Sequence, residues 1–231
     1  MASLTKEELI QLCDFDGEKY IQKSGDEYIL ALSQLFSLTN KNDKPFTLRD
    51  IEEQPALESF NFSGKNDFKK VCSLELTPLE FNPKTNKRKN ETIKAVDFVS
   101  PQAKKVFETS LGVAYLMTCV VNGVERIIKI GQTRNTFKNR LGSYNCGCVT
   151  NWRTASTTNI KLKQSMVTTR QKIELYLFDC QKTETFEWHG IKSVPFASPF
   201  SLAVEDIMIK QFIAQFNKKP LINIQANATT V

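Results

Sequence analysis

The sequence predicts an α/β protein of the α+β kind, in which a small antiparallel sheet is flanked by helices and preceded by a helical and β-rich region. Two observations predict this class: residues 113–130 are β-prone around a tight-turn signal, and helix-type apolar spacing occurs on both sides of them. The 231 residues are 41% hydrophobic and 24% charged, a composition typical of globular proteins with a real core. We expect two regions, residues 1–105 and 106–231.

The region of residues 1–105 begins with helices and continues with strands. Helical patterns occupy residues 5–13 and 28–36 and begin again at Thr47. Two β-rich runs, residues 71–81 and 92–98, flank a basic loop. The basic residues of this loop are Lys84, Lys87, Arg88 and Lys89. The loop resembles the wing of a DNA-binding domain, so we expect these side chains to contact phosphates and the region to recognise DNA; a solvated tip that protects an edge strand explains the same lysines.

A β-hairpin is predicted next, after a helical connector at residues 100–110. Residues 113–121 are apolar and β-prone, and residues 126–130 return as a second strand. Between them, Asn122-Gly123 is a strong signal for a type I′ turn. The turn and the two runs together make this hairpin the clearest local feature of the sequence.

Polar side chains follow the hairpin on a helix. Arg140 and Tyr144 lie four residues apart and therefore share one helical face. This stretch resembles the GIY-YIG nuclease family, in which two strands carry Gly-Ile-Tyr and Tyr-Ile-Gly and the next helix carries an arginine with a histidine or tyrosine four residues later. The matching stretches are Val113-Ala114-Tyr115, Lys129-Ile130-Gly131, and Arg140 with Tyr144. Lys129 stands where the family has a tyrosine.

Two later residues extend the resemblance to about half of the chain. The family pattern has a glutamate on a later helix and an asparagine shortly after a proline near the end of the domain. Glu205 stands early in the helical run "SPFSLAVEDIMIKQFIAQF", whose Leu202, Ile209 and Phe212 we expect on the buried side. Asn223 follows in "KKPLIN".

The resemblance implies a Mg²⁺-dependent DNA endonuclease that hydrolyses phosphodiester bonds. Tyr115 is the implied general base, and Lys129 is a candidate for the cation that lowers its pKa. Arg140 is expected to bind the scissile phosphate through its planar fork of donors. Tyr144 is expected to donate to the phosphate or to assist the attacking water.

The metal is expected to depend on Glu205. A carboxylate oxygen suits a hard cation, so Glu205 is the implied ligand of one Mg²⁺ per site, with Mn²⁺ as a substitute. Asn223 is expected to hold the site together by hydrogen bonds. Taken singly, these residues are better explained by strand packing for Tyr115, a solvent-facing cation–π pair for Arg140 and Tyr144, helix-dipole compensation for Glu205 and a turn for Asn223. Their joint order along the chain favours the nuclease interpretation.

Several functions remain open within this interpretation. The lysine at 129 and the tyrosine at 144 resemble variants found among type II restriction endonucleases, and a phage or mobile-element endonuclease is the close alternative. A non-catalytic nucleic-acid-binding protein on the same fold is an alternative of another class. One site per chain cuts one strand, so double-strand cleavage requires a homodimer on double-stranded DNA or two sequential nicks. No nucleotide cofactor is expected.

Charge and cysteine usage agree with a DNA partner inside the cell. The formal net charge is +6 and the pI is about 8.9, which suits a polyanion. A basic, Ser/Thr-rich insertion with Lys161 and Lys163 is also expected to contact phosphates, although a solvated loop explains it nearly as well. We find no secretory signal or membrane span in the sequence, and we expect the six cysteines to be reduced and the protein to be cytoplasmic.

Overall fold

The computed structural model describes a defined part of the chain. The described residues are 48–77, 81–82, 87–88, 92–145, 158–159, 162–163, 166, 171–185, 187–193 and 196–223. The helices predicted at residues 5–13 and 28–36 lie outside these ranges, as do Lys84, Lys89 and Lys161.

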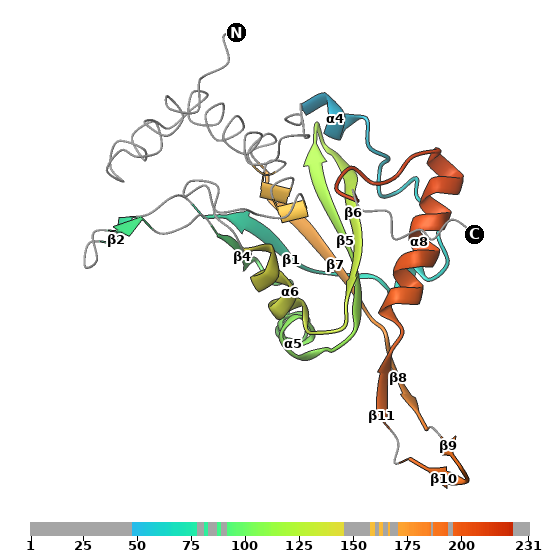
Figure 1. The fold of residues 1–231 in the computed structure, drawn as a ribbon. Helices are drawn as coiled ribbons and strands as arrows, with labels where there is room; N and C mark the ends of the chain where they lie inside the picture. The colour runs from blue at the N-terminus through green and yellow to red at the C-terminus, as the bar shows by residue number, and fades with distance from the viewer. Residues whose placement is uncertain are drawn as a thin grey trace.

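A five-stranded antiparallel sheet forms the centre of the described fold, in the order β4-β1-β7-β5-β6 (Figure 1). The strands are β1 (Lys69–Leu76), β4 (Ile93–Val96), β5 (Val113–Val121), β6 (Val124–Thr133) and β7 (Ile173–Asp179). The α+β class with a small antiparallel sheet and flanking helices is therefore confirmed. β5 and β6 are the predicted hairpin, and positive φ angles at Asn122 (51°) and Gly123 (74°) confirm its type I′ turn.

The sheet contains strands from both sides of the boundary that was expected at residue 105. β1 and β4 form the hairpin predicted from the two β-rich runs, but β1 also pairs with β7, with Leu74 opposite Ile173. Strands from before residue 105 therefore complete the sheet that contains β5 and β6. The short strands β2 (Phe81–Asn82) and β3 (Lys87–Arg88) pair with each other beyond this hairpin, and DNA recognition by the region stays a prediction.

Helices cover both faces of the sheet (Figure 1). They are α4 (Leu48–Glu52), the 3-10 turn η1 (Lys65–Asp67), α5 (Pro101–Thr109), α6 (Phe137–Tyr144) and α8 (Ser201–Phe216). Local capping explains two of the starts. The Ser100 hydroxyl accepts from the Ala103 N–H at 3.0 Å before α5, and the Thr136 hydroxyl accepts from the Asn139 N–H at 3.2 Å before α6.

Alternation along β5 separates the two cores. Tyr115 and Met117 pack with Phe107 of α5 and Phe137 of α6, whereas Leu116 packs on the opposite face. On that opposite face, Met208 and Phe212 of α8 are buried. Leu202 was expected on the buried side of α8, and this expectation is wrong, because 46% of it is exposed. The buried stripe instead runs through Ser201, Met208 and Phe212, so Leu202 lies beside it.

A hairpin arm leaves the sheet after β7. It is built from β8 (Gln181–Glu184) with β11 (Phe196–Pro199), and from β9 (Glu187–Trp188) with β10 (Ile191–Lys192). The arm projects away from the sheet and returns into α8 (Figure 1). Across the described ranges, every helix is too short or too polar to cross a bilayer.

Candidate active site

Tyr115 and Gly131 face each other across β5 and β6, and the tyrosine ring covers the glycine. The two residues are Cα partners in the sheet, and Tyr115 is fully buried. A Cβ atom placed on Gly131 would lie 2.2 Å from the ring carbon Cζ and 2.3 Å from the hydroxyl oxygen of Tyr115. Glycine at 131 is therefore required for the ring to lie where it does.

The hydroxyl of Tyr115 contacts two other polar side chains, those of Tyr144 and Arg140. The hydroxyl groups of Tyr115 and Tyr144 share a short hydrogen bond. Arg140 Nε donates to the Tyr115 hydroxyl at 3.4 Å, and the Arg140 guanidinium carbon lies 4.6 Å from the centre of the Tyr144 ring. The predicted i,i+4 pair on α6 therefore contacts the predicted tyrosine of β5. We call these three residues the tyrosine–arginine cluster.

Burial keeps both tyrosines of the cluster protonated at neutral pH. Loss of solvation raises the pKa of Tyr115, and the positive charge of Arg140 and the hydrogen bond from Tyr144 only partly oppose it. Loss of solvation also raises the pKa of Tyr144 well above its ordinary value. For Arg140, burial lowers the pKa but the two phenol groups raise it by more, so its guanidinium stays charged. The cation that acts on the Tyr115 pKa is Arg140, whereas the sequence suggested Lys129 for this part.

Lys129 lies on the same face of the sheet, opposite Met117, and is only 6% exposed. The strand pairing shifts between Met117 and Thr118, so Ile128 is an extra residue of β6 at this point, which is a β-bulge. Burial and the nearby charge of Arg140 lower the pKa of Lys129 to about 8, while Glu205 opposes the shift. Lys129 can therefore lose its proton near neutral pH.

Glu205 reaches this neighbourhood from α8. The helix begins at Ser201, whose hydroxyl donates to the Gln132 side chain at 3.0 Å and so fixes the first turn of α8 beside the end of β6. Burial raises the pKa of the Glu205 carboxyl, whereas the charges of Lys129 and Arg140 lower it. Among the described residues no hydrogen bond or ion pair to the Glu205 carboxylate is found. With respect to the described part of the chain, both of its oxygens are available to a ligand.

Asn223 closes the edge strand beside the site. Its Oδ1 accepts from the Ile130 N–H at 3.0 Å, and its Nδ2 donates to the Ile130 carbonyl at 2.8 Å. Ile130 lies between Lys129 and Gly131, so Asn223 holds the backbone that carries both residues. These two hydrogen bonds show how Asn223 can hold the site together, as the sequence led us to expect.

The charged groups fit one hard cation at Glu205. The described residues hold no group of three or more His, Cys, Asp or Glu side chains, so an all-protein metal cage is not found in them. Mg²⁺ binds through one or two carboxylates and takes its other ligands from water and substrate phosphate. A single available carboxylate beside two cationic side chains that attract phosphate fits that donor set.

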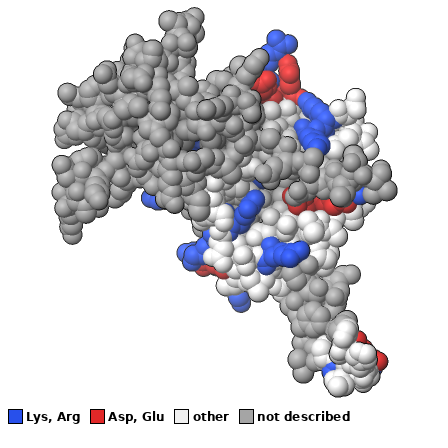
Figure 2. All heavy atoms as spheres, viewed as in Figure 1, with Lys and Arg blue, Asp and Glu red and all other residues white. Residues whose placement is uncertain are grey.

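The expected phosphate-binding lysines are only partly described. Lys163 is 2% exposed and has a partner, so its ammonium group does not lie on an open surface of the described structure. Lys87 and Arg88 are the two residues of strand β3. Figure 2 shows Lys and Arg side chains over the part of the molecule where Figure 1 places α5 and α6. Lys104, Lys105 and Lys138 are exposed on these helices. Sequence reasoning missed this surface, and the adjacent Lys104 and Lys105 were its signal in the sequence.

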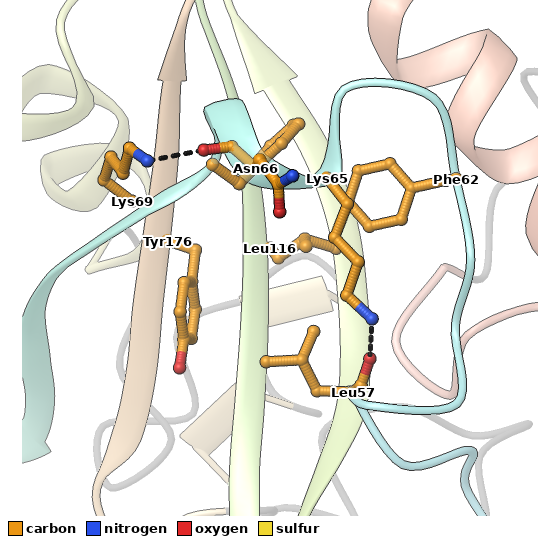
Figure 3. A pocket seen from close by; sticks show the side chains of 8 residues that line it. Leu57, Phe62, Lys65, Asn66, Lys69, Leu116 and Tyr176 are labelled. Atoms are coloured by element: carbon orange, nitrogen blue, oxygen red, sulfur yellow. Dashed lines mark hydrogen bonds between the residues drawn. The ribbon is translucent and has the colours of Figure 1, made fainter.

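A hollow on the opposite face of the sheet is a separate feature (Figure 3). Leu116 and Tyr176 line its floor, and Lys65 lies at its wall. The Lys65 ammonium donates to the carbonyls of Leu57 at 2.9 Å, Glu58 at 3.0 Å and Phe60 at 2.8 Å. These contacts use all three donors of the ammonium. Lys65 therefore fastens the loop after α4, and this hollow does not share the chemistry of the tyrosine–arginine cluster.

Comparison with known proteins gives one structural likeness. The comparison with protein-family models finds no match, and neither does the comparison with curated proteins. Among solved structures, the chain is similar to the restriction endonuclease HPY188I in complex with product DNA, at 25% identity and a TM-score of 0.44. The match covers 78% of this chain and 91% of the other. The function proposed below therefore rests on the site residues and their geometry.

Proposed function

We propose that the protein is a Mg²⁺-dependent DNA endonuclease of the GIY-YIG type, with a type II restriction endonuclease as its subtype. The observation that supports this most strongly is the meeting of Tyr115, Tyr144 and Arg140 in one buried contact cluster, although they come from two separate elements. Lys129 and Glu205 act electrostatically on each other and on Arg140. A phosphate-binding cation, a proton acceptor and a metal ligand thus share one neighbourhood.

Arg140 is proposed to bind the scissile phosphate. Its Nε donates to Tyr115 and its guanidinium carbon lies over the Tyr144 ring, and the remaining donors of the guanidinium can bind a phosphate. Half-burial strengthens the interaction because fewer water molecules screen the charge. The exposed lysines of α5 and α6 extend positive charge outward from this point, which suits the backbone of double-stranded DNA.

Lys129 is proposed to accept the proton of the attacking water. A general base works best when its pKa is close to the working pH. The pKa of Lys129 is lowered to about 8, whereas that of Tyr115 is raised. Neutral Lys129 takes a proton from water as the water oxygen attacks phosphorus. The bond from phosphorus to the 3′-oxygen breaks, the leaving 3′-oxygen takes up a proton from solvent water, and the products are a 5′-phosphate and a 3′-hydroxyl.

Tyr115 and Tyr144 are proposed to orient the reacting groups as neutral donors. Their shared hydrogen bond fixes both hydroxyl groups beside Arg140. Glu205 would hold the Mg²⁺, which when bound supplies Lewis-acid stabilisation of charge on the phosphate and the leaving oxygen. Asn223 keeps Lys129 and Gly131 in place through the Ile130 backbone.

Cleavage of supercoiled plasmid tests the proposed function. We expect the wild type to cut in Mg²⁺ and to stop cutting in chelator. Glu205→Gln keeps the size of the side chain but removes the carboxylate charge, so we expect cleavage to fall by about 100-fold or more. The matched control is Asp206→Asn, which removes the adjacent carboxylate of α8 that pairs with Lys210 at 2.8 Å. The control should cut like the wild type.

The outcomes of this assay separate the proposed functions. Discrete fragments from a long DNA would support a restriction or mobile-element endonuclease. Intact plasmid at every pH and with either Mg²⁺ or Mn²⁺, together with retained DNA binding, would overturn the catalytic proposal. It would leave a non-catalytic nucleic-acid-binding protein.

The pH dependence of cleavage tests the proton acceptor. Because Lys129 is neutral only above its pKa of about 8, we expect the single-turnover rate to rise with pH through 8 and then level off. Arginine keeps the positive charge but stays protonated at these pH values, so Lys129→Arg should lose activity by about 100-fold, as should the nearly isosteric Lys129→Met. If Lys129→Met keeps the rising limb and Tyr115→Phe loses it, Tyr115 is the base instead.

A further inference from the structure

The end of α6 is fastened to the sheet by Asn145. This residue follows Tyr144 directly, and its N–H donates to the Leu141 carbonyl at 3.2 Å in the last turn of α6. Its side chain reaches β4, where Oδ1 accepts from the Ile93 N–H at 2.7 Å and Nδ2 donates to the Ile93 carbonyl at 2.9 Å. The amide thus pairs with one residue of β4 as a neighbouring strand would.

The same pairing occurs at the other edge of the sheet. β4 and β6 are the two edge strands, and Asn223 pairs with Ile130 of β6 through the same two kinds of hydrogen bond. Each of these asparagines adjoins the site: Asn223 pairs between Lys129 and Gly131, and Asn145 follows Tyr144. An edge strand offers unpaired N–H and C=O groups. Asn145 and Asn223 bind these groups on β4 and β6, and so attach two parts of the site to the edges of the sheet.

From this geometry we propose that Asn145 is a positioning residue, which fixes α6 so that Arg140 and Tyr144 meet Tyr115. The proposal rests on the proposed function. α6 has only eight residues, which is too short to be stable without tertiary contacts. Its apolar contacts through Phe137 and Leu141 hold it against the sheet but are non-directional. The two hydrogen bonds of Asn145 are directional, so they fix the position of α6 along the sheet.

Loss of this anchor should change catalysis more than DNA binding. Arg140 lies little more than one helical turn before Asn145, and its contact with Tyr115 is already long at 3.4 Å. A displacement of about 1 Å in a catalytic group is enough to lower a rate by about 100-fold. α5 packs on β1 as well as on Phe137 of α6, and Asn145→Ala leaves these contacts in place, so the exposed lysines of α5 should still attract DNA.

The experiment compares Asn145→Ala with Thr77→Val. The Thr77 hydroxyl donates to the Thr92 carbonyl at 2.9 Å and accepts from the Thr92 N–H at 3.0 Å, so it fastens the residue before Ile93 without touching α6. Asn145→Ala removes two side-chain hydrogen bonds to β4, and Thr77→Val removes the two with the Thr92 backbone and a third with the Thr92 hydroxyl at 3.0 Å, so the control should lower the melting temperature at least as much. We expect single-turnover cleavage to fall by about 100-fold in Asn145→Ala alone, with the Kd for DNA in chelator nearly unchanged.

Amide hydrogen exchange gives a readout that does not depend on cleavage. In Asn145→Ala, the amides of α6 should exchange faster relative to those of α5, and in Thr77→Val they should not. Unchanged α6 exchange in Asn145→Ala, or an equal loss of cleavage in both variants, would overturn the proposal. A wild type that never cuts DNA overturns the proposed function and the catalytic consequence together, while faster α6 exchange would still establish the anchor.

A charged replacement provides a second check. Asn145→Asp keeps an acceptor for the Ile93 N–H but places a carboxylate oxygen against the Ile93 carbonyl. Protonation restores a donor at that position, so the deficit in melting temperature should shrink as the pH falls toward about 4. The sign follows because the repulsion raises the pKa of the introduced carboxyl in the folded state, which favours folding at low pH. A deficit that is constant with pH would contradict the pairing.

Discussion

Gly131→Ala is expected to lower the rate of DNA cleavage by about 100-fold or more, because the new methyl group occupies the space of the Tyr115 ring. The added Cβ would lie 2.2 to 2.4 Å from three atoms of that ring, so the ring must move. The Tyr115 ring makes an edge-to-face contact with Phe137, with ring centres 5.1 Å apart, and its hydroxyl is hydrogen-bonded to Arg140 and Tyr144. Movement of the ring therefore disturbs the whole cluster.

Gly142→Ala is the matched control for this prediction. Gly142 lies on α6, the helix that carries Arg140, and an added Cβ meets no described atom within 4 Å other than those of its own stretch of helix. Alanine should stabilise the helix by up to about 1 kcal/mol and leave cleavage intact. The measurement is single-turnover cleavage together with thermal unfolding. Wild-type cleavage by Gly131→Ala would show that the position of the Tyr115 ring does not matter to the reaction.

Arg140→Lys is expected to lower cleavage by about 100- to 1,000-fold even though the positive charge is kept. The Arg140 guanidinium donates to Tyr115 and lies over the Tyr144 ring, and we propose that its fork of donors binds phosphate. A lysine ammonium offers a point charge without the fork or the plane. The loss should therefore appear in the rate constant at saturating protein, with a smaller change in the Kd for DNA.

Arg134→Ala is the control for the loss of charge. Arg134 is exposed and lies before α6, so its removal takes away a guanidinium near the site without touching the cluster. Its rate constant at saturating protein should match the wild type. Equal losses in Arg140→Lys and Arg134→Ala would mean that Arg140 contributes general attraction for DNA and does not contact the reacting phosphate.

The parts of the fold that local signals specify were predicted from the sequence. The Asn122-Gly123 turn, the two strands beside it and α6 all depend on short-range rules of turn chemistry and periodicity. The pairing of β1 with β7 was not predictable in this way. Ser73 and Glu174 bond at 2.8 Å across about a hundred residues of chain, and no local pattern specifies which distant strand is the partner.

The candidate site was predicted in its residues but not in its electrostatics. The order of Tyr115, Arg140 and Tyr144 along the chain indicated that they meet, and the structure brings them into contact. The sequence suggested Lys129 as the cation that acts on Tyr115, whereas Arg140 acts on it, because the outcome depends on the bulge at Ile128 and on where Lys129 is buried. Asn145 carried no sequence signal, since an asparagine after a helix is a common end residue.

Cleavage of a short DNA duplex in water enriched in oxygen-18 tests the central claim, that Lys129 and the tyrosine–arginine cluster together direct water to hydrolyse a phosphodiester bond. With wild type and Mg²⁺, we predict one heavy oxygen in the 5′-phosphate of each new end and none in the 3′-hydroxyl, and a cleavage rate lowered by about 100-fold or more with Glu205→Gln. A DNA strand covalently attached to the protein through Tyr115, heavy oxygen on the 3′ side, or no cleavage by the wild type would contradict the account.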